Sequence, residues 1–264
     1  MSLLHQIAIT KINNVGPVSA KSIIAHLGSP EALWSASAAD LVAIPQIAQI
    51  TAQQILSDRD DALSRAEIEL KFIEKNKVST LYYLNDDYPR RLKYFDQSPV
   101  MLYYQGSANL NPQRTIGIVG TRKPSEYGVI QCEKIVEGLK TYGVSIISGL
   151  AYGIDTTSHR KSVETGQETI GVLGHGLNMV YPATNRKLSQ KMVNHGGLLT
   201  EFGHDSKPDR EQSIVDYIRS HKELPIDTLQ HLMQIPASEL SSTLIQLEFK
   251  GMVRPLPGKR YMMQ

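Results

Sequence analysis

The sequence of 264 residues has a single cysteine, Cys132, and no long uninterrupted apolar run. One thiol cannot form an intramolecular disulfide, and it cannot supply a zinc site built from several cysteines. Without about 18 consecutive apolar residues, no segment is expected to span a membrane. The first residues also lack the basic start and apolar stretch of a signal peptide, so a cytoplasmic location is expected.

A strong charge of either sign is also lacking. The chain has 28 Lys and Arg residues against 26 Asp and Glu residues, which gives a formal net charge of +2. Many dedicated DNA-binding modules are more basic, so any binding of nucleic acid would depend on a few well-placed contacts. With 41% hydrophobic and 20% charged residues, the composition is that of a folded protein, and its length suggests two or three domains.

The patterning predicts a helical domain over residues 1–75, an α/β domain over 76–203, a linker over 204–211 and a winged-helix domain over 212–264. The helical domain contains Gly16-Pro17 between two helical runs, as in a helix-hairpin-helix, where amides at a glycine turn can face a phosphate. A weaker second copy has Gln46 in its turn, so no phosphate is expected there. For the first copy, contact with DNA and a purely structural role both remain open.

The α/β domain has four short apolar runs, Thr115–Val119, Val144–Ser148, Thr169–Leu173 and Leu198–Glu201, which alternate with helical segments. Short apolar strands separated by helices predict a mostly parallel sheet with helices on both faces, a Rossmann-like doubly wound α/β fold. Two earlier strands are expected at about 80–84 and 100–104.

Glycine-bearing loops follow three of these four runs. In a parallel sheet such loops meet beyond the carboxyl ends of the strands, where ligands collect. Glycine lets a phosphate approach the backbone amides, and the start of the next helix favours an anion. We therefore predict a phosphate-binding edge made of Gly120, Thr121, Arg122, Ser148, Gly149, Gly153, Gly174, His175 and Gly176.

Four other residues are possible auxiliary contacts. Arg90 and Arg91 form a basic cluster beside Tyr88, although a solvated surface is the more common role for such residues. Asp155 and His159 lie four residues apart on one helical face, and we expect Asp155 to cap the helix and His159 to pack beside it. Arg122 is expected to bind phosphate, with a surface salt bridge to Glu126 as the alternative. No catalytic residue, metal ligand or cofactor is assigned.

The C-terminal domain is expected to have three helices followed by a β-hairpin. The start of the third helix carries Ser238, Ser241, Ser242 and Thr243 and few cations. Readers of duplex DNA usually place basic side chains there. Contact with a protein, or a structural role, therefore remains at least as well supported as duplex recognition.

Several runs of the sequence resemble the DprA (Smf) family of DNA-processing proteins. They are Gly117–Arg122, Ser148–His159, Gly171–Leu177, Tyr181–Asn185 and Leu199–Phe202. The resemblance implies a protein without enzymatic activity that binds incoming single-stranded DNA, protects it and loads RecA recombinase in natural transformation. It also implies that Arg122 contacts phosphate and that the chain forms a homodimer through the Rossmann-like domain.

The chain departs from this family after Phe202. The family continues with a basic F-P-x-R-N-R segment and an S-G-x-x-x-T-A stretch, whereas Gln212 here already belongs to the winged helix. About one half of the Rossmann-like domain is therefore expected to be absent, with a second basic wall for DNA and the dimer surface. The homodimer is expected only if that segment is present.

Two other functions remain as alternatives. One is a nucleotide phosphoribohydrolase of the lysine-decarboxylase-like family, although the P-G-G-x-G-T segment of that family does not occur in this sequence. The other is a protein-interaction adaptor that docks partners through its helix-hairpin-helix and winged-helix domains. Retention of partners after nuclease treatment would favour the adaptor.

Overall fold

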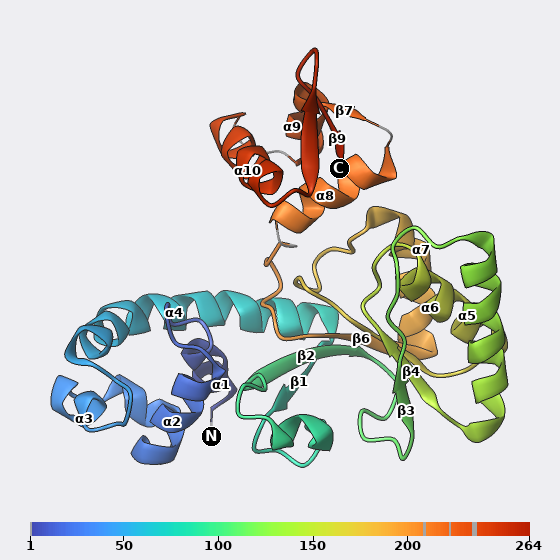
Figure 1. Ribbon diagram of the computed structural model, residues 1–264. Coiled ribbons are helices and arrows are strands. Elements are labelled where there is room, and N and C mark those ends of the chain that lie inside the picture. Colours follow the sequence, from blue (N-terminus) through green and yellow to red (C-terminus); the bar gives the residue numbers. More distant parts are fainter. Residues whose placement is uncertain (1, 208–209, 222, 234–236) are drawn as a thin grey trace. The chain divides into compact units, whose positions relative to one another are not determined.

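The computed structural model describes residues 2–207, 210–221, 223–233 and 237–264 (Figure 1). The chain divides into two compact units, Met1–Ser206 and Lys207–Gln264. Among the described helices, none is both long and apolar enough to cross a membrane.

The first unit begins with helices that form two successive hairpins. They are α1 (Leu3–Ile9), α2 (Pro17–Leu27), the 3-10 turn η1 (Glu31–Trp34), α3 (Ala38–Val42) and α4 (Gln49–Asn76). Proline at the first position of α2 suits a helix start, and Gly28, with φ of 85°, ends the helix in the left-handed conformation. Ser37 and Asp40 form a reciprocal capping box at the start of α3.

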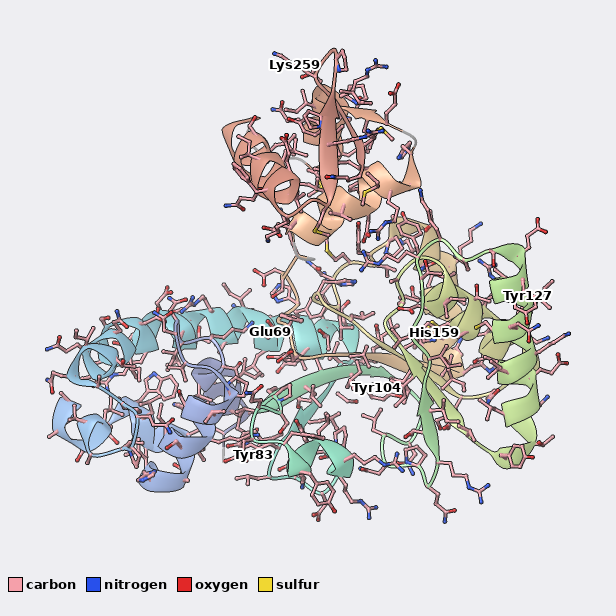
Figure 2. All side chains as sticks on the ribbon, in the orientation of Figure 1. Glu69, Tyr83, Tyr104, Tyr127, His159 and Lys259 are labelled. Atoms are coloured by element: carbon pink, nitrogen blue, oxygen red, sulfur yellow. The ribbon has the colours of Figure 1, made fainter. Side chains whose placement is uncertain are left out.

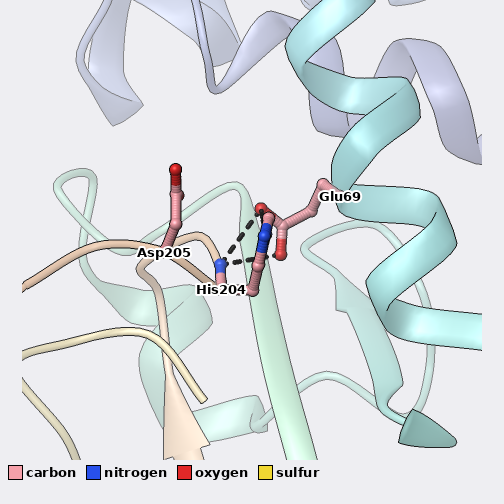
Figure 3. Close-up of side chains that lie close together, drawn as sticks. All are labelled: Glu69, His204 and Asp205. Carbon is pink, nitrogen blue, oxygen red and sulfur yellow. Dashed lines mark hydrogen bonds and ion pairs between the residues drawn. The ribbon is translucent and has the colours of Figure 1, made fainter. Parts of the chain in front are cut away.

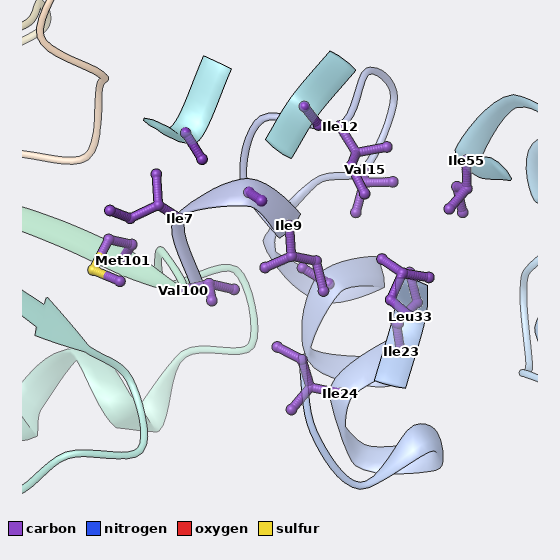
Figure 4. Close-up of a cluster of buried hydrophobic side chains, with 14 of the residues drawn as sticks. Ile7, Ile9, Ile12, Val15, Ile23, Ile24, Leu33, Ile55, Val100 and Met101 are labelled. Atoms are coloured by element: carbon purple, nitrogen blue, oxygen red, sulfur yellow. The ribbon is translucent and has the colours of Figure 1, made fainter. Parts of the chain in front are cut away.

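One apolar core joins these helices to the first strands of the sheet (Figure 4). Ile7, Ile23 and Leu33 from the helices are fully buried, and Met101 of a following strand belongs to the same cluster. Because a single core crosses residue 75, the proposed boundary between a helical and an α/β domain at that residue stays a prediction.

A six-stranded sheet follows, in the order β1-β2-β6-β5-β4-β3. Its strands are β1 (Ser79–Tyr82), β2 (Met101–Gly106), β3 (Thr115–Gly117), β4 (Ser145–Ser148), β5 (Thr169–Val172) and β6 (Gly196–Thr200). The four strands β3 to β6 are parallel, with Ile116 opposite Ile146 and Ile147 opposite Ile170. Strand β2 pairs antiparallel with both β1 and β6. The predicted mostly parallel α/β sheet is confirmed.

Two glycines allow β6 to join β2. A Cβ atom on Gly197 would lie 2.3 Å from the ring of Tyr104, and one on Gly196 would lie 1.9 Å from the carbonyl oxygen of Thr169. Any side chain at these positions would therefore force the strands apart. The Tyr104 hydroxyl donates to the Gly196 carbonyl at 2.8 Å, which fastens the antiparallel junction.

The α-helices of this unit lie on one side of the sheet (Figure 1). Helices α5 (Glu126–Leu139), α6 (Ile154–Thr165) and α7 (Arg186–Asn194), with the 3-10 turns η3 (Lys140–Tyr142) and η4 (Ala183–Asn185), connect strands that are neighbours in the sheet. Right-handed crossovers that always move in the same direction place their helices on the same face. We call this side the covered face.

The opposite side, here called the open face, carries Ile147, Ile170, Val172 and Leu199. Within residues 2–206 only the segments 83–99 and 107–113, on either side of β2, pack on it, through Tyr88, Leu92 and Leu110. The first of these segments includes the short 3-10 turn η2 (Arg90–Tyr94). This differs from the expected winding on both faces. The strand order β6-β5-β4-β3 never reverses, so no crossover in this unit sends a helix to the other face.

The second unit has the expected winged-helix architecture. Its elements are α8 (Arg210–Ser220), β7 (Leu224–Pro225), α9 (Ile226–Met233), α10 (Ala237–Phe249), β8 (Val253–Leu256) and β9 (Arg260–Met263), with strand order β7-β9-β8. Its core includes Ile214, Leu229, Leu244 and Val253. Pro208 and Asp209 of the predicted linker lie outside the described residues.

Candidate nucleic-acid interface

Three of the predicted loops meet at one edge of the sheet. Strands β3, β4 and β5 are parallel neighbours, so the residues that follow them lie at the same carboxyl edge. Gly120, Gly149 and Gly174 stand there, and all three are exposed to solvent. We call this region the glycine edge.

The turn at Gly120-Thr121-Arg122 packs directly on the start of α6. The Thr121 carbonyl accepts a hydrogen bond from the Ile154 amide at 3.1 Å. Gly153 has φ of 80°, and a Cβ atom there would lie 2.2 Å from the Thr121 carbonyl oxygen. Thr121 remains exposed and Arg122 is half-buried. Gly153 therefore serves the contact between two loops, which holds the Thr121 backbone in place at the edge.

The Asp155 carboxylate accepts hydrogen bonds from backbone amides of a loop that was predicted to bind phosphate. The donors are the amides of Gly149 at 3.2 Å and Ala151 at 3.4 Å. The expected helix cap is wrong: the N-cap residue of α6 is Gly153, and Asp155 lies in the first turn and reaches back to the preceding loop. A phosphate at Gly149 would have to compete with this carboxylate, which is of the same charge sign.

Ser148 and His159 are among the predicted residues that lie in the interior. The Ser148 hydroxyl donates to the Ile118 carbonyl at 2.7 Å, which ties the segment after β3 to the end of β4. His159 is fully buried, with Nδ1 2.6 Å from the Thr169 hydroxyl. Burial lowers the pKa of His159 to about 4, so the ring is neutral at pH 7. A fully buried ring cannot touch a DNA strand at the surface.

His175 shapes its own loop. Its Nε2 accepts from the Tyr181 amide at 3.2 Å, and its Nδ1 lies 2.9 Å from the Gly176 carbonyl, which assigns the ring proton to Nδ1. A Cβ atom on Gly176 would lie 2.1 Å from the Gly203 carbonyl oxygen, so this glycine permits a close approach of two segments. Gly174 has open space around it, and it is the residue of this loop that a ligand can approach.

Arg90 and Arg91 lie on the open face, at a groove of about 770 Å³. The Arg91 guanidinium donates to the Thr115 hydroxyl and, at 3.0 Å, to the Gln113 carbonyl. The floor of the groove includes Leu102, Ile147, Ile170, Val172 and Leu199, and the groove extends to Leu173 and Glu201 at the carboxyl ends of β5 and β6. The residue pattern predicts helices on both faces of the sheet, so it gives no sign of this groove.

A polar cluster of one buried, one half-buried and one exposed side chain joins α4 to the segment after β6 (Figure 3). Glu69 of α4 is 1% exposed and accepts from the Lys11 ammonium at 2.7 Å and from the His204 amide at 2.8 Å. Asp205 stands beside them, and one donor atom from each of Glu69, His204 and Asp205 lies within 4.8 Å of the others. Lys11 already compensates the Glu69 charge, so we interpret the cluster as a link between the helices and the segment after β6. Residues 135 positions apart leave no local pattern by which it could have been predicted.

The polar residues of the third helix, α10, and of its end offer little to DNA. Lys250, the cation expected near the end of the third helix, forms an ion pair with Glu211 at 2.6 Å. Thr243 is buried, and the side chains of Ser238 and Ser242 lie outside the described residues. Among the described residues, these observations favour a structural role for this helix over duplex recognition.

The fold defines the class of protein: a Rossmann-like α/β unit that begins with helical hairpins and is followed by a winged helix. Family comparisons agree with each part. Residues 79–214 match the family described as DNA recombination-mediator protein A, residues 7–61 match a SAM-like helix-hairpin-helix tandem, and residues 204–259 match the DprA winged helix domain. The chain belongs to the DNA recombination-mediator protein A family.

Individual relatives agree with this assignment. The chain is 31% identical over 213 residues to Protein Smf of Synechocystis sp. PCC 6803, covering 78% of this chain and 52% of the relative. It is 36% identical over 135 residues to DNA processing protein DprA of Streptococcus pneumoniae, covering 51% of this chain and 48% of the relative. The chain thus spans about half the length of these curated relatives.

A solved structure shows the same fold. The X-ray structure of DprA from Streptococcus pneumoniae superposes with a TM-score of 0.64 at 24% sequence identity, covering 82% of this chain and 73% of that chain. At this level of identity the likeness concerns the fold alone.

Proposed function

We propose that this chain is a non-enzymatic, cytoplasmic protein that binds single-stranded DNA through the glycine edge. The observation that carries the proposal is the convergence of exposed Gly120, Gly149 and Gly174 at one carboxyl edge, with Arg122 beside them. Exposed glycine backbone lets phosphates approach closely, and a guanidinium can bind a phosphate through two hydrogen bonds. Membership of a recombination-mediator family supports DNA as the source of these phosphates.

The contacts within the edge refine the assignment of roles. Because Asp155 already holds the amides of Gly149 and Ala151, phosphate is assigned to Gly120, Thr121, Arg122 and Gly174. Ser148, Gly149, Gly153, His175 and Gly176 are then positioning residues, which fix the loops that present the backbone.

In the cell, we assign to this chain the protection of incoming DNA and the loading of RecA recombinase during natural transformation. Two features support this assignment: the family model and the name DNA processing protein that its relatives carry. The chain spans about half the length of such relatives, so dimerisation is expected only where the remaining half of the domain is supplied.

Replacing Arg122 tests the DNA site. In a fluorescence anisotropy titration with a labelled oligo-dT strand, Arg122→Ala should weaken binding roughly tenfold and reduce the salt dependence by about one phosphate contact. Lys140→Ala is the matched control, because Lys140 is an exposed cation in η3, just before the amino end of β4 and thus at the opposite edge of the sheet. Equal effects of the two substitutions, or none from Arg122→Ala, would show that the assigned site is wrong.

The absence of enzymatic activity has its own test. Incubation with nucleoside monophosphates should release no free base. Release that disappears in Asp155→Asn would instead support a phosphoribohydrolase.

A further inference from the structure

Two aromatic rings stand in solvent at the end of η2. Tyr94 is 86% exposed and Phe95 is 64% exposed. Rings of this size usually contribute to a core or an interface, because their burial removes a large apolar area from water. Adjacent exposed rings on one turn therefore call for a ligand that covers them.

The backbone that carries these rings is firmly held. The Lys21 ammonium, from α2, donates to the Asp96 carbonyl at 3.0 Å and to the Ser98 hydroxyl at 2.7 Å. The Phe95 amide donates to the Leu92 carbonyl at 3.0 Å, and the Ser98 amide donates to the Phe95 carbonyl at 3.0 Å. The turn is thus fixed at both ends of the aromatic pair, so the rings are presented on an ordered support.

Charge around the rings is nearly balanced. Three cations, Arg90, Arg91 and Lys93, share the segment 85–96 with three carboxylates, Asp86, Asp87 and Asp96. Phosphate attraction at this turn is therefore expected to be weak, and a ligand would bind mainly through its flat faces. Nucleobases have such faces, and stacking on aromatic side chains is how many proteins hold single strands without reading their sequence.

The turn also lies along a path from the glycine edge. The residues just before the rings, Arg90 to Leu92, form one wall of the open-face groove, and the same groove reaches Leu173 and Glu201 at the carboxyl ends of β5 and β6. A strand whose phosphates lie at the glycine edge can therefore continue across the open face to η2.

We propose that Tyr94 and Phe95 form a stacking platform for the bases of the single strand bound at the glycine edge. The proposal rests on the proposed DNA-binding function and adds a second contact of different chemistry. The glycine edge takes phosphates and is sensitive to salt, whereas the platform takes bases and is nearly insensitive to salt.

The test uses the full chain and two labelled strands of equal length, oligo-dT and an abasic strand with the same phosphates. Replacing both rings, Tyr94→Ala with Phe95→Ala, should weaken binding of oligo-dT roughly tenfold and leave the salt dependence and the affinity for the abasic strand unchanged. Tyr94→Phe with Phe95→Tyr keeps both rings and should bind like the unaltered chain. Tyr142→Ala is the matched control, because Tyr142 is 63% exposed in η3 at the opposite edge of the sheet, whereas Tyr127 lies in the first turn of α5, just after the loop that carries Arg122 (Figure 2).

Each other outcome is informative. If Arg122→Ala weakens binding and the double alanine variant does not, the platform is wrong and the proposed function stands. If the unaltered chain fails to bind oligo-dT at all, the proposed function itself fails. Equal losses for oligo-dT and the abasic strand would show that the rings do not stack on bases. Capture of a protein partner through these rings, with oligo-dT affinity unaffected by the double variant, would assign the surface to protein contact.

Discussion

The two faces of the sheet differ in what lies on them. On the covered face, Ile146, Val136 and Met192 are fully buried between strands and helices. On the open face, the two segments that flank β2 cover Ile170 and Leu199 without a long helix, and they leave Val172 44% exposed beside the groove. The difference follows from the strand order β6-β5-β4-β3, because its crossovers all move in one direction and place their helices on one face. These four parallel strands are thus enough to bury one face and to form the glycine edge.

The largest expected effect comes from adjacent isoleucines of β4 that point to opposite faces. Ile146→Ala should lower the free energy of unfolding by about 2–5 kcal/mol, because it opens a cavity in a closed core. Ile147→Ala should cost roughly half as much or less, since Ile147 is only partly buried and borders the groove. Urea unfolding followed by the fluorescence of Trp34, which lies in the first unit, measures both. Equal costs would mean that the two faces are equally closed.

Much of this arrangement could be predicted from the sequence. Short apolar runs and the glycines that follow them identify the parallel strands and their shared edge. They do so because each strand and the loop after it have a local residue pattern that recurs along the chain. The runs Ser148–His159 and Tyr181–Asn185, together with the other matching runs, also indicated the family to which the chain belongs. The winged helix could be predicted in the same way, from three helical segments followed by a β-hairpin.

The remaining features depend on contacts that sequence spacing does not encode. The bond of Asp155 to the Gly149 amide depends on how tightly one loop turns. The link between Glu69 and His204 joins segments that are far apart in the chain. Exposure of Tyr94 and Phe95 could not be read from their residue types either, because aromatic residues are usually buried and only the fold shows which are not.

The second prediction concerns the pH dependence of stability, which we expect to involve the buried His159. In the folded chain His159 stays neutral down to its lowered pKa of about 4, whereas in the unfolded chain it takes up a proton near pH 6.5. The neutral, buried ring of His159 therefore makes its full contribution to the free energy of unfolding above about pH 6.5. As the pH falls towards 4, protonation of this histidine in the unfolded chain lowers the free energy of unfolding by roughly 2–3 kcal/mol.

The free energy of unfolding is measured between pH 7 and pH 4.5 in two histidine variants, so that the effect of His159 can be distinguished from that of the carboxylates, which titrate in a neighbouring pH range. His159→Gln should flatten the pH dependence, whereas His195→Gln, which changes an exposed histidine in the same unit, should leave it as it is. An unchanged slope in His159→Gln would mean that the buried ring is not the group that responds.

The smallest expected effect is on the open face. Val172→Thr keeps the shape of a partly exposed side chain and should change the free energy of unfolding by less than about 1 kcal/mol. Val136→Thr, the same change at a fully buried position of α5, places a hydroxyl in the apolar core of the covered face and should cost about 1–3 kcal/mol. Because Val172 borders an exposed apolar groove, its substitution should also reduce self-association, which light scattering at rising protein concentration would detect. If Val172→Thr instead destabilises the chain as much as Val136→Thr, the open face must be covered in solution, and the contrast between the two faces would apply only to the isolated chain.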